Sequence, residues 1–126
     1  MKALTIPTLI LALLLSLSLW IGSAVRTRTE ACLHPLAPSD ALAREENWSQ
    51  AAEQLRQSYR IWQQCQFFFH AIMEHQELDE AESLFAAAFA ACDEEDEPDF
   101  HTALAQLQTA LEHLREKQQL RAENIF

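Results

Sequence analysis

Two histidines and two glutamates near the middle of the chain are residue types that bind divalent metal ions. His70 and Glu74 are four residues apart, so on a helix they share one face, whereas His75 is turned about 100° from Glu74. His-Glu-x-x-His is absent from the sequence. The sequence favours a solvated turn, in which Glu77 and Asp79 cap the next helix and His75 hydrogen-bonds across the connection. We therefore predict no metal site, and His70, Glu74, His75 and Glu77 are the candidate ligands of the alternative.

A second cluster, Asp93 to Asp99, places six acidic residues in seven positions. Carboxylates attract Ca²⁺, but this run lacks the alternating ligands and the central glycine of an EF-hand. The sequence therefore predicts weak calcium association at most. The alternative is a mobile, self-repelling loop whose last residue, Asp99, caps the following helix.

Three cysteines cannot all pair within one chain, so at least one thiol is free or bonds to another chain. If their helices are antiparallel across a turn near residues 75–77, Cys65 and Cys92 lie about five residues out of register. We expect both to be small buried residues. Cys32 lies in a segment expected to be flexible. It is the candidate for a disulfide between two copies of the chain, and a homodimer stays open.

Several classes of function are excluded by composition. No glycine follows Gly22, which removes phosphate-binding loops, dinucleotide fingerprints and nucleophile elbows. The formal net charge of −10 argues against nucleic acid as a partner, because phosphate binding needs a basic surface. We predict no catalytic residue and no cofactor, and we expect a protein that is not an enzyme.

The N-terminal segment is a predicted membrane anchor. Residues 3–25 carry no charge and, as a helix about 34 Å long, would cross the hydrocarbon of a bilayer. Trp20 suits the interface, and Arg26 and Arg28 follow as anchors. A cleaved signal peptide is the alternative, because Gly22-Ser23-Ala24 supplies the small residues of a cleavage site. We expect residues 1–25 to be uncleaved, with the N-terminus in the cytoplasm and the remainder outside.

The rest of the chain is predicted to be helical. Ala, Leu, Gln and Glu dominate it, and β-branched residues are scarce. Apolar residues recur at helical spacing in three stretches that begin at Trp48, Leu78 and Phe100. Residues 26–46 are expected to be a juxtamembrane segment with a short helix near Ser39 to Glu46. Residues 47–126 are expected to form an antiparallel bundle of three to four helices, with Asn47 capping its first helix.

Most aromatic residues of the bundle are expected in its core. Three consecutive phenylalanines, Phe67 to Phe69, span about 200° of a helix and cannot all face one neighbour. Phe67 is the one predicted to be exposed. We take it as a candidate contact with another protein or with the bilayer surface.

Four short motifs support a family resemblance. They are Asn47-Trp48, the run from Glu74 to Asp79, Leu111-Glu112-His113 and the terminal Glu123-Asn124-Ile125-Phe126. Together with the N-terminal hydrophobic segment, they make the chain similar to the small bacterial single-pass membrane proteins of domain of unknown function 4363. The resemblance implies an anchor, a helical body and a bacterial envelope setting. It implies no activity.

These observations favour a non-enzymatic, membrane-tethered helical module for interaction or scaffolding at the outer face of a bacterial membrane. Its expected partners are the lipid bilayer, through residues 3–25, and a protein. The alternative function is an envelope protein that binds a ligand or metal through His70, Glu74 and the acidic run.

Overall fold

The computed structural model describes residues 2–125, with side chains for residues 3–117. The side chains of the terminal motif from Glu123 to Phe126 lie outside that range. The described chain contains five helices and no strand. In chain order they are α1 (Lys2–Leu33), α2 (Leu36–Arg44), α3 (Trp48–Ile72), α4 (His75–Asp93) and α5 (Glu97–Ile125).

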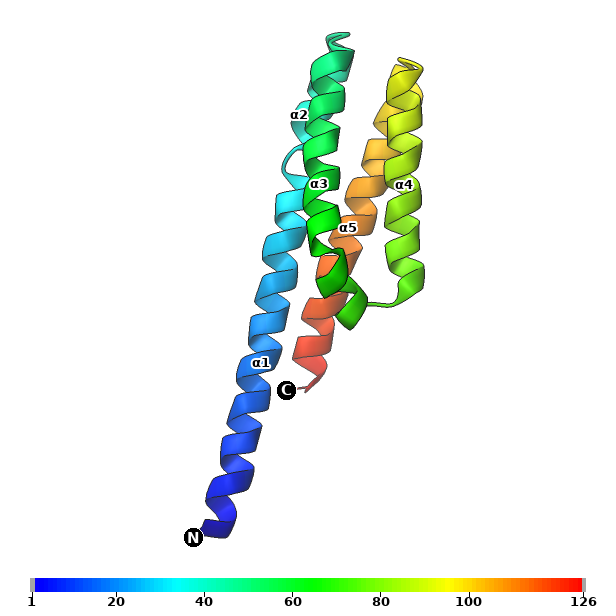
Figure 1. Cartoon of the computed structure of the whole chain (residues 1–126). Coiled ribbons are helices and arrows are strands. Elements are labelled where there is room, and N and C mark those ends of the chain that lie inside the picture. Colours follow the sequence, from blue (N-terminus) through cyan, green and yellow to red (C-terminus); the bar gives the residue numbers. More distant parts are fainter. Residues whose placement is uncertain (1, 126) are drawn as a thin grey trace.

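The four long helices form an antiparallel bundle, and the expected all-α fold is confirmed (Figure 1). Each long helix packs against two others in the cyclic order α1, α3, α4, α5, and the short α2 packs on α3 and α5. The N-terminal half of α1 projects beyond the bundle as a single arm, at the end where α3 turns into α4 (Figure 1). The α2–α3 and α4–α5 turns lie at the opposite, distal end.

Large aromatic side chains fill the core. Trp62, Phe69, Phe85 and Phe100 are each at most 1% exposed. Leucines at helical spacing on α5 pack against them, as the apolar periodicity predicts. Fully burying one such side chain contributes about 1.5 to 3 kcal/mol, so this layer supplies much of the stability of the bundle.

Buried hydroxyl groups join α1 and α2 to α3. Ser58 Oγ donates to the carbonyl of Cys32 at 2.6 Å, and Ser39 Oγ donates to the carbonyl of Ala51 at 2.7 Å. Thr29 Oγ1 donates within its own helix to the carbonyl of Val25 at 2.7 Å. Among the residues described, every buried side-chain nitrogen or oxygen has a partner. These bonds fix the register of the helices without leaving a polar group unsatisfied.

Helix α1 is longer than the sequence predicts. Residues 26–33, expected as the start of a juxtamembrane segment, continue α1 without a break. The reason is a buried stripe of Val25, Thr29 and Cys32, which recur at helical spacing and face the bundle. Arg26 and Glu30 occupy the exposed side of the same turns. The prediction of a flexible segment around Cys32 is therefore wrong.

The short helix begins earlier than expected. It was predicted near Ser39 to Glu46 and is found at Leu36–Arg44, with Pro35 at its N-cap. Pro38 lies in its first turn, where an amide hydrogen is not needed for the helix ladder. Only His34 and Pro35 separate α1 from α2, which continues toward the distal end of the bundle (Figure 1).

The helix starts match the predicted caps only in part. Asn47 accepts a hydrogen bond from the backbone amide of Gln50, which confirms it as the cap of α3. The cap predicted at Asp99 is wrong, because α5 begins two residues earlier and Asp96 accepts the bond from the Asp99 amide. Helix α4 begins at His75, which places Glu77 in its first turn instead of at a cap. The caps predicted at Glu77 and Asp79 are therefore also wrong.

The acidic run is a tight turn of three residues between two helix ends, so the predicted loop is shorter than the run itself. Asp93 ends α4, Glu97 begins α5, and three residues lie between them. The amide of Asp96 donates to the carbonyl of Ala91 at 3.0 Å, and that of Glu95 donates to Cys92 at 3.1 Å. This is the Schellman pattern, which requires a left-handed residue. Glu95 takes that conformation with φ of 53°, and Glu46 does the same after α2 with φ of 61°.

Replacing Glu95 with glycine is expected to stabilise the protein by about 1 kcal/mol. A side chain in the left-handed region costs about 1 to 2 kcal/mol, and glycine avoids that cost. Glu94→Gly is the matched control, because it removes the same charge at a residue with φ of −83°. It should destabilise by a similar amount. Urea unfolding followed by circular dichroism measures both, and equal effects of the two variants would refute the assignment.

Candidate functional site

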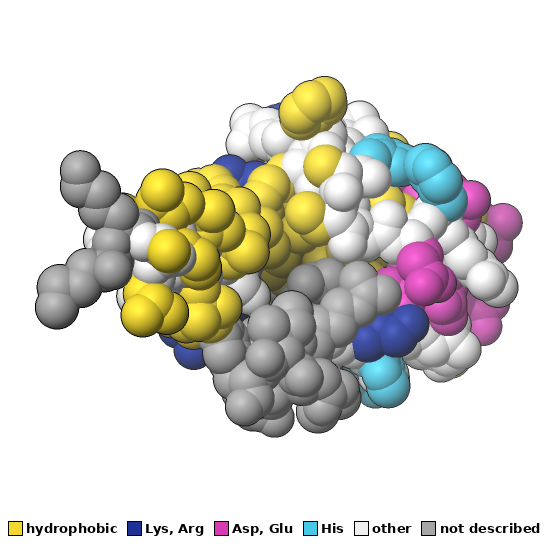
Figure 2. Space-filling view, turned by 90° about the horizontal axis from the view of Figure 1, so that it is seen from below, with side chains coloured by type: hydrophobic (Ala, Val, Ile, Leu, Met, Phe, Trp, Pro, Cys, Tyr) yellow, Lys and Arg dark blue, Asp and Glu magenta, His cyan; other side chains and the backbone are white. Residues whose placement is uncertain are grey.

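The projecting arm of α1 is the largest apolar surface of the described chain. Its exposed large hydrophobic side chains run from Leu4 to Trp20 and are between 49% and 76% exposed. An 18-residue window of this helix has a mean hydropathy of 2.2, and none of the window is buried. Seen from the arm's own end, hydrophobic side chains gather on the arm, and the histidines and acidic residues lie at the other side (Figure 2). Helix α1 is thus long and apolar enough to span a membrane.

An aromatic and cationic cluster lies where the arm meets the bundle. Trp20 contacts Phe68 edge-on, with ring centroids 6.4 Å apart. The Arg28 guanidinium lies 4.1 Å from the centroid of the same Phe68 ring, a cation–π geometry. Next to them on α3, Phe67 is 88% exposed, as its position in the aromatic run predicts. Its role as a partner contact stays a prediction.

The four metal-ligand candidates are not brought together. His70 and His75 lie against each other across the α3–α4 turn, with ring centroids 5.1 Å apart. Glu77 pairs instead with Lys117 of α5. No group of three metal-binding side chains occurs in the described part of the chain. Metal binding stays the alternative hypothesis, tested by a thermal shift with Zn²⁺ or Ca²⁺ that His70→Ala abolishes.

Glu82 is a half-buried carboxylate of α4 with three hydrogen-bond donors, and the sequence did not single it out. Its carboxylate accepts hydrogen bonds from the Tyr59 hydroxyl, from Trp62 Nε1 at 2.7 Å and from Gln66 Nε2 at 3.2 Å. The bond to Glu82 raises the pKa of Tyr59, and burial raises it further. The available signal was Gln66, the polar interruption in the apolar stripe of α3. Three donors on one helix imply an acceptor opposite them.

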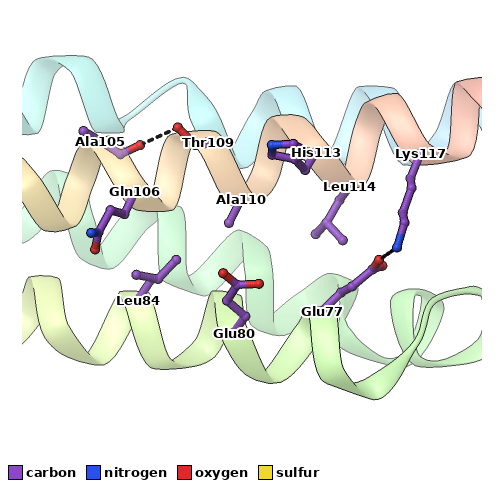
Figure 3. Close-up of a pocket in the computed structure, with 10 residues that line it drawn as sticks. All are labelled: Glu77, Glu80, Leu84, Ala105, Gln106, Thr109, Ala110, His113, Leu114 and Lys117. Atoms are coloured by element: carbon purple, nitrogen blue, oxygen red, sulfur yellow. Dashed lines mark hydrogen bonds and ion pairs between the residues drawn. The ribbon is translucent and has the colours of Figure 1, made fainter.

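An open groove of about 720 Å³ runs between α4 and α5. In Figure 3, Glu80 and Leu84 extend from α4 toward Ala110 of α5, and the Glu77–Lys117 ion pair closes one end of the row. Small side chains at Ala105, Thr109 and Ala110 leave the space open. The lining combines carboxylates, His113, Lys117 and apolar carbon. Such a surface suits a helical or extended peptide segment better than a small metabolite.

The three thiols are free and buried. Cys65 and Cys92 are small core residues, as predicted, but the register used to place them is wrong. The α3–α4 turn lies at Met73 and Glu74, and Trp62 faces Glu82 and Phe85. Cys32 has an exposed fraction of 0%, so it is not placed to form the predicted disulfide between chains while the bundle is folded. Burial, and then the neighbouring Cys65, raises the pKa of the Cys32 thiol to about 12.

The buried Cys32 thiol predicts alkaline destabilisation. In the unfolded chain a thiol loses its proton near its ordinary pKa of 9.0, whereas folded Cys32 keeps its proton until about 12. Ionisation therefore favours the unfolded state as pH rises above 9, and by pH 11 this costs about 2 to 3 kcal/mol. The free energy of unfolding, measured with urea from pH 8 to pH 11, should fall less steeply for Cys32→Ala. Parallel curves for the two proteins would contradict this prediction.

A family model described as Domain of unknown function (DUF4363) matches residues 19–125. The chain belongs to this family. The DUF4363 match covers the whole bundle and the last two residues of the exposed arm, so it confirms the resemblance carried by the short motifs. The match does not show whether the chain crosses a membrane. The evidence on that point is the length and hydropathy of α1. Comparison with curated proteins gave no match, and comparison with solved structures gave none either.

Proposed function

We propose that this DUF4363 protein is a non-enzymatic, single-pass interaction module of the bacterial cell envelope. Residues 3–25 anchor it, and the bundle stands on the outer face of the membrane. The observation that carries the proposal is the exposed apolar arm, because apolar side chains in this number would be unfavourable in water. At about 25 cal/mol per Å² of apolar surface, transfer of the arm into lipid is strongly favourable.

The α4–α5 groove is the surface proposed to bind a protein partner. Helix α4 does not pack on α1, so the anchor leaves its outer side accessible. Carboxylates of Glu77 and Glu80 lie on the α4 side of the groove, while His113 and Lys117 lie on the α5 side. A partner segment with apolar residues between charged ones would match this lining.

The tether is tested in cells that express a C-terminally tagged chain. We expect the full-length mass in the membrane fraction, and digestion of the tag when protease is added to intact cells. A shorter soluble chain that begins near Val25 would show a cleaved signal peptide and overturn the tether. A full-length chain whose tag is digested only after lysis would overturn the proposed orientation.

The groove is tested in the same cells with a photo-crosslinking amino acid at Thr109. The control carries the same amino acid at Gln57, an exposed residue of α3 outside the groove. A discrete adduct at Thr109 that is absent at Gln57 supports the groove as the binding surface. An adduct of twice the chain mass identifies the partner as a second copy. Equal adducts at both positions would refute a specific site.

A further inference from the structure

The last two turns of α3, residues 66–72, lie beside residues 16–24 of α1, the last part of its uncharged segment. The two helices are antiparallel, and two contacts set their register: Trp20 meets Phe68, and Ser58 donates to the Cys32 carbonyl. One residue along α3 therefore corresponds to one residue back along α1. By this register Phe67 lies level with residues 21–23, where the uncharged segment approaches its end at Val25.

Phe67 is also the one large apolar side chain that the described bundle leaves exposed. Every other exposed large hydrophobic residue in that part of the chain lies in the arm, from Leu4 to Trp20. A phenylalanine ring that is 88% exposed contributes no burial energy to the core, whereas transfer of the same ring from water to a membrane interface is favourable. Phe67 is next in sequence to Phe68, which contacts Trp20 at the end of the arm, so its exposed ring lies near the apolar span.

The orientation of this surface is fixed by α1. Val25, Thr29 and Cys32 are buried against the bundle, and α1 continues from the arm through these residues as one helix. A bilayer that receives the arm therefore meets the α3 end of the bundle at a set height. Arg28, held over Phe68, is placed at the level of lipid headgroups, where guanidinium groups bind phosphate.

We propose that Phe67 inserts into the interface of the same bilayer that holds the anchor, and that it docks the bundle against the membrane together with Trp20 and Phe68. The occupant of this surface is lipid, specifically the boundary between headgroups and acyl chains. The inference rests on the proposed membrane tether. The experiment is designed to distinguish contact of Phe67 with lipid from contact of Phe67 with a protein partner.

The test uses the full chain in phosphatidylcholine and phosphatidylglycerol vesicles, with Trp20→Phe as the background. In this background, Phe67→Trp adds an indole at the proposed contact, and the emission of the Trp20→Phe chain, which comes from Trp48 and Trp62, is subtracted from each spectrum. Arg60→Trp is the control, because it lies two turns away on the same face of α3 and is exposed. Lipids brominated near the headgroup quench an inserted indole, and aqueous iodide quenches a solvated one.

We expect bromolipid to reduce the emission of the F67W indole about twofold and to leave the R60W indole unchanged, with the reverse pattern for iodide. F67W emission quenched only by iodide would overturn the docking. Emission protected from both quenchers would also overturn it and would indicate a protein contact. Flotation with vesicles is measured in parallel, because a chain that does not float has lost the tether itself, whereas a floating chain with a solvated indole refutes only the docking.

Discussion

Replacing both Leu11 and Leu14 with arginine is expected to release the chain from the membrane fraction. Each charge at the centre of a span costs about 2.5 to 3.5 kcal/mol, so the pair costs about 5 to 7 kcal/mol. Both leucines are 57% exposed in the arm and do not contribute to the core, so the bundle should remain folded. Flotation of membranes from cells that express the variant measures the distribution, and circular dichroism checks the fold.

The matched control places two arginines outside the span, as Ala86→Arg with Ala90→Arg. Both alanines are exposed on α4 and are separated from the arm by the cross-section of the bundle. This control adds the same charge and should remain in the membrane fraction. Retention of the Leu11 and Leu14 variant at the level of the control would mean that α1 does not insert.

Trp62→Ala is expected to cost about 3 to 5 kcal/mol of unfolding free energy, a large part of the stability of a domain of this size. The indole is 1% exposed and packs against Phe69 and Phe85, with ring centroids 5.4 and 5.9 Å away. Its removal leaves a cavity and takes one donor from the Glu82 carboxylate. Urea unfolding of the purified chain, followed by circular dichroism, gives the difference.

Trp62→Phe helps to separate the two contributions, because it keeps a six-membered ring in the core and removes the Nε1 donor together with the rest of the five-membered ring. We expect a loss of about 1.5 to 3 kcal/mol, the usual range for a hydrogen bond to a charged group. The indole packing is then the difference between the alanine and phenylalanine variants. If Trp62→Ala costs less than about 1 kcal/mol, the proposed aromatic core is wrong.

The helical architecture could be predicted because apolar periodicity reports burial directly. Stripes that begin at Trp48, Leu78 and Phe100 identified three helices, and Asn47 marked one start because its side chain can only cap there. The exposure of Phe67 followed from the geometry of three successive phenylalanines. Each of these predictions depends on residues near one another in sequence.

Apart from the misplaced caps, the errors share a physical cause, which is that they depend on contacts between distant segments. The boundary at Val25 followed the first charge, but Thr29 and Cys32 remain helical because α3 covers them. The register that misplaced the two cysteines assumed a turn position that only packing of α3 on α4 determines. Glu82 looked like an ordinary surface acid until the helix opposite supplied its three donors.

The unbroken course of α1 gives the distal end of the molecule a fixed height. From Phe67 to Trp48, α3 rises about 29 Å, and Cys92 Sγ lies 3.9 Å from the Trp48 carbonyl. With α1 in a bilayer, the acidic turn from Glu94 to Asp96 stands about 30 Å above the interface and moves only as the whole molecule tilts. With the proposed anchor in a bilayer, this turn and the helix ends beside it would place six carboxylates, between Asp93 and Asp99, at the end of the bundle away from the lipid.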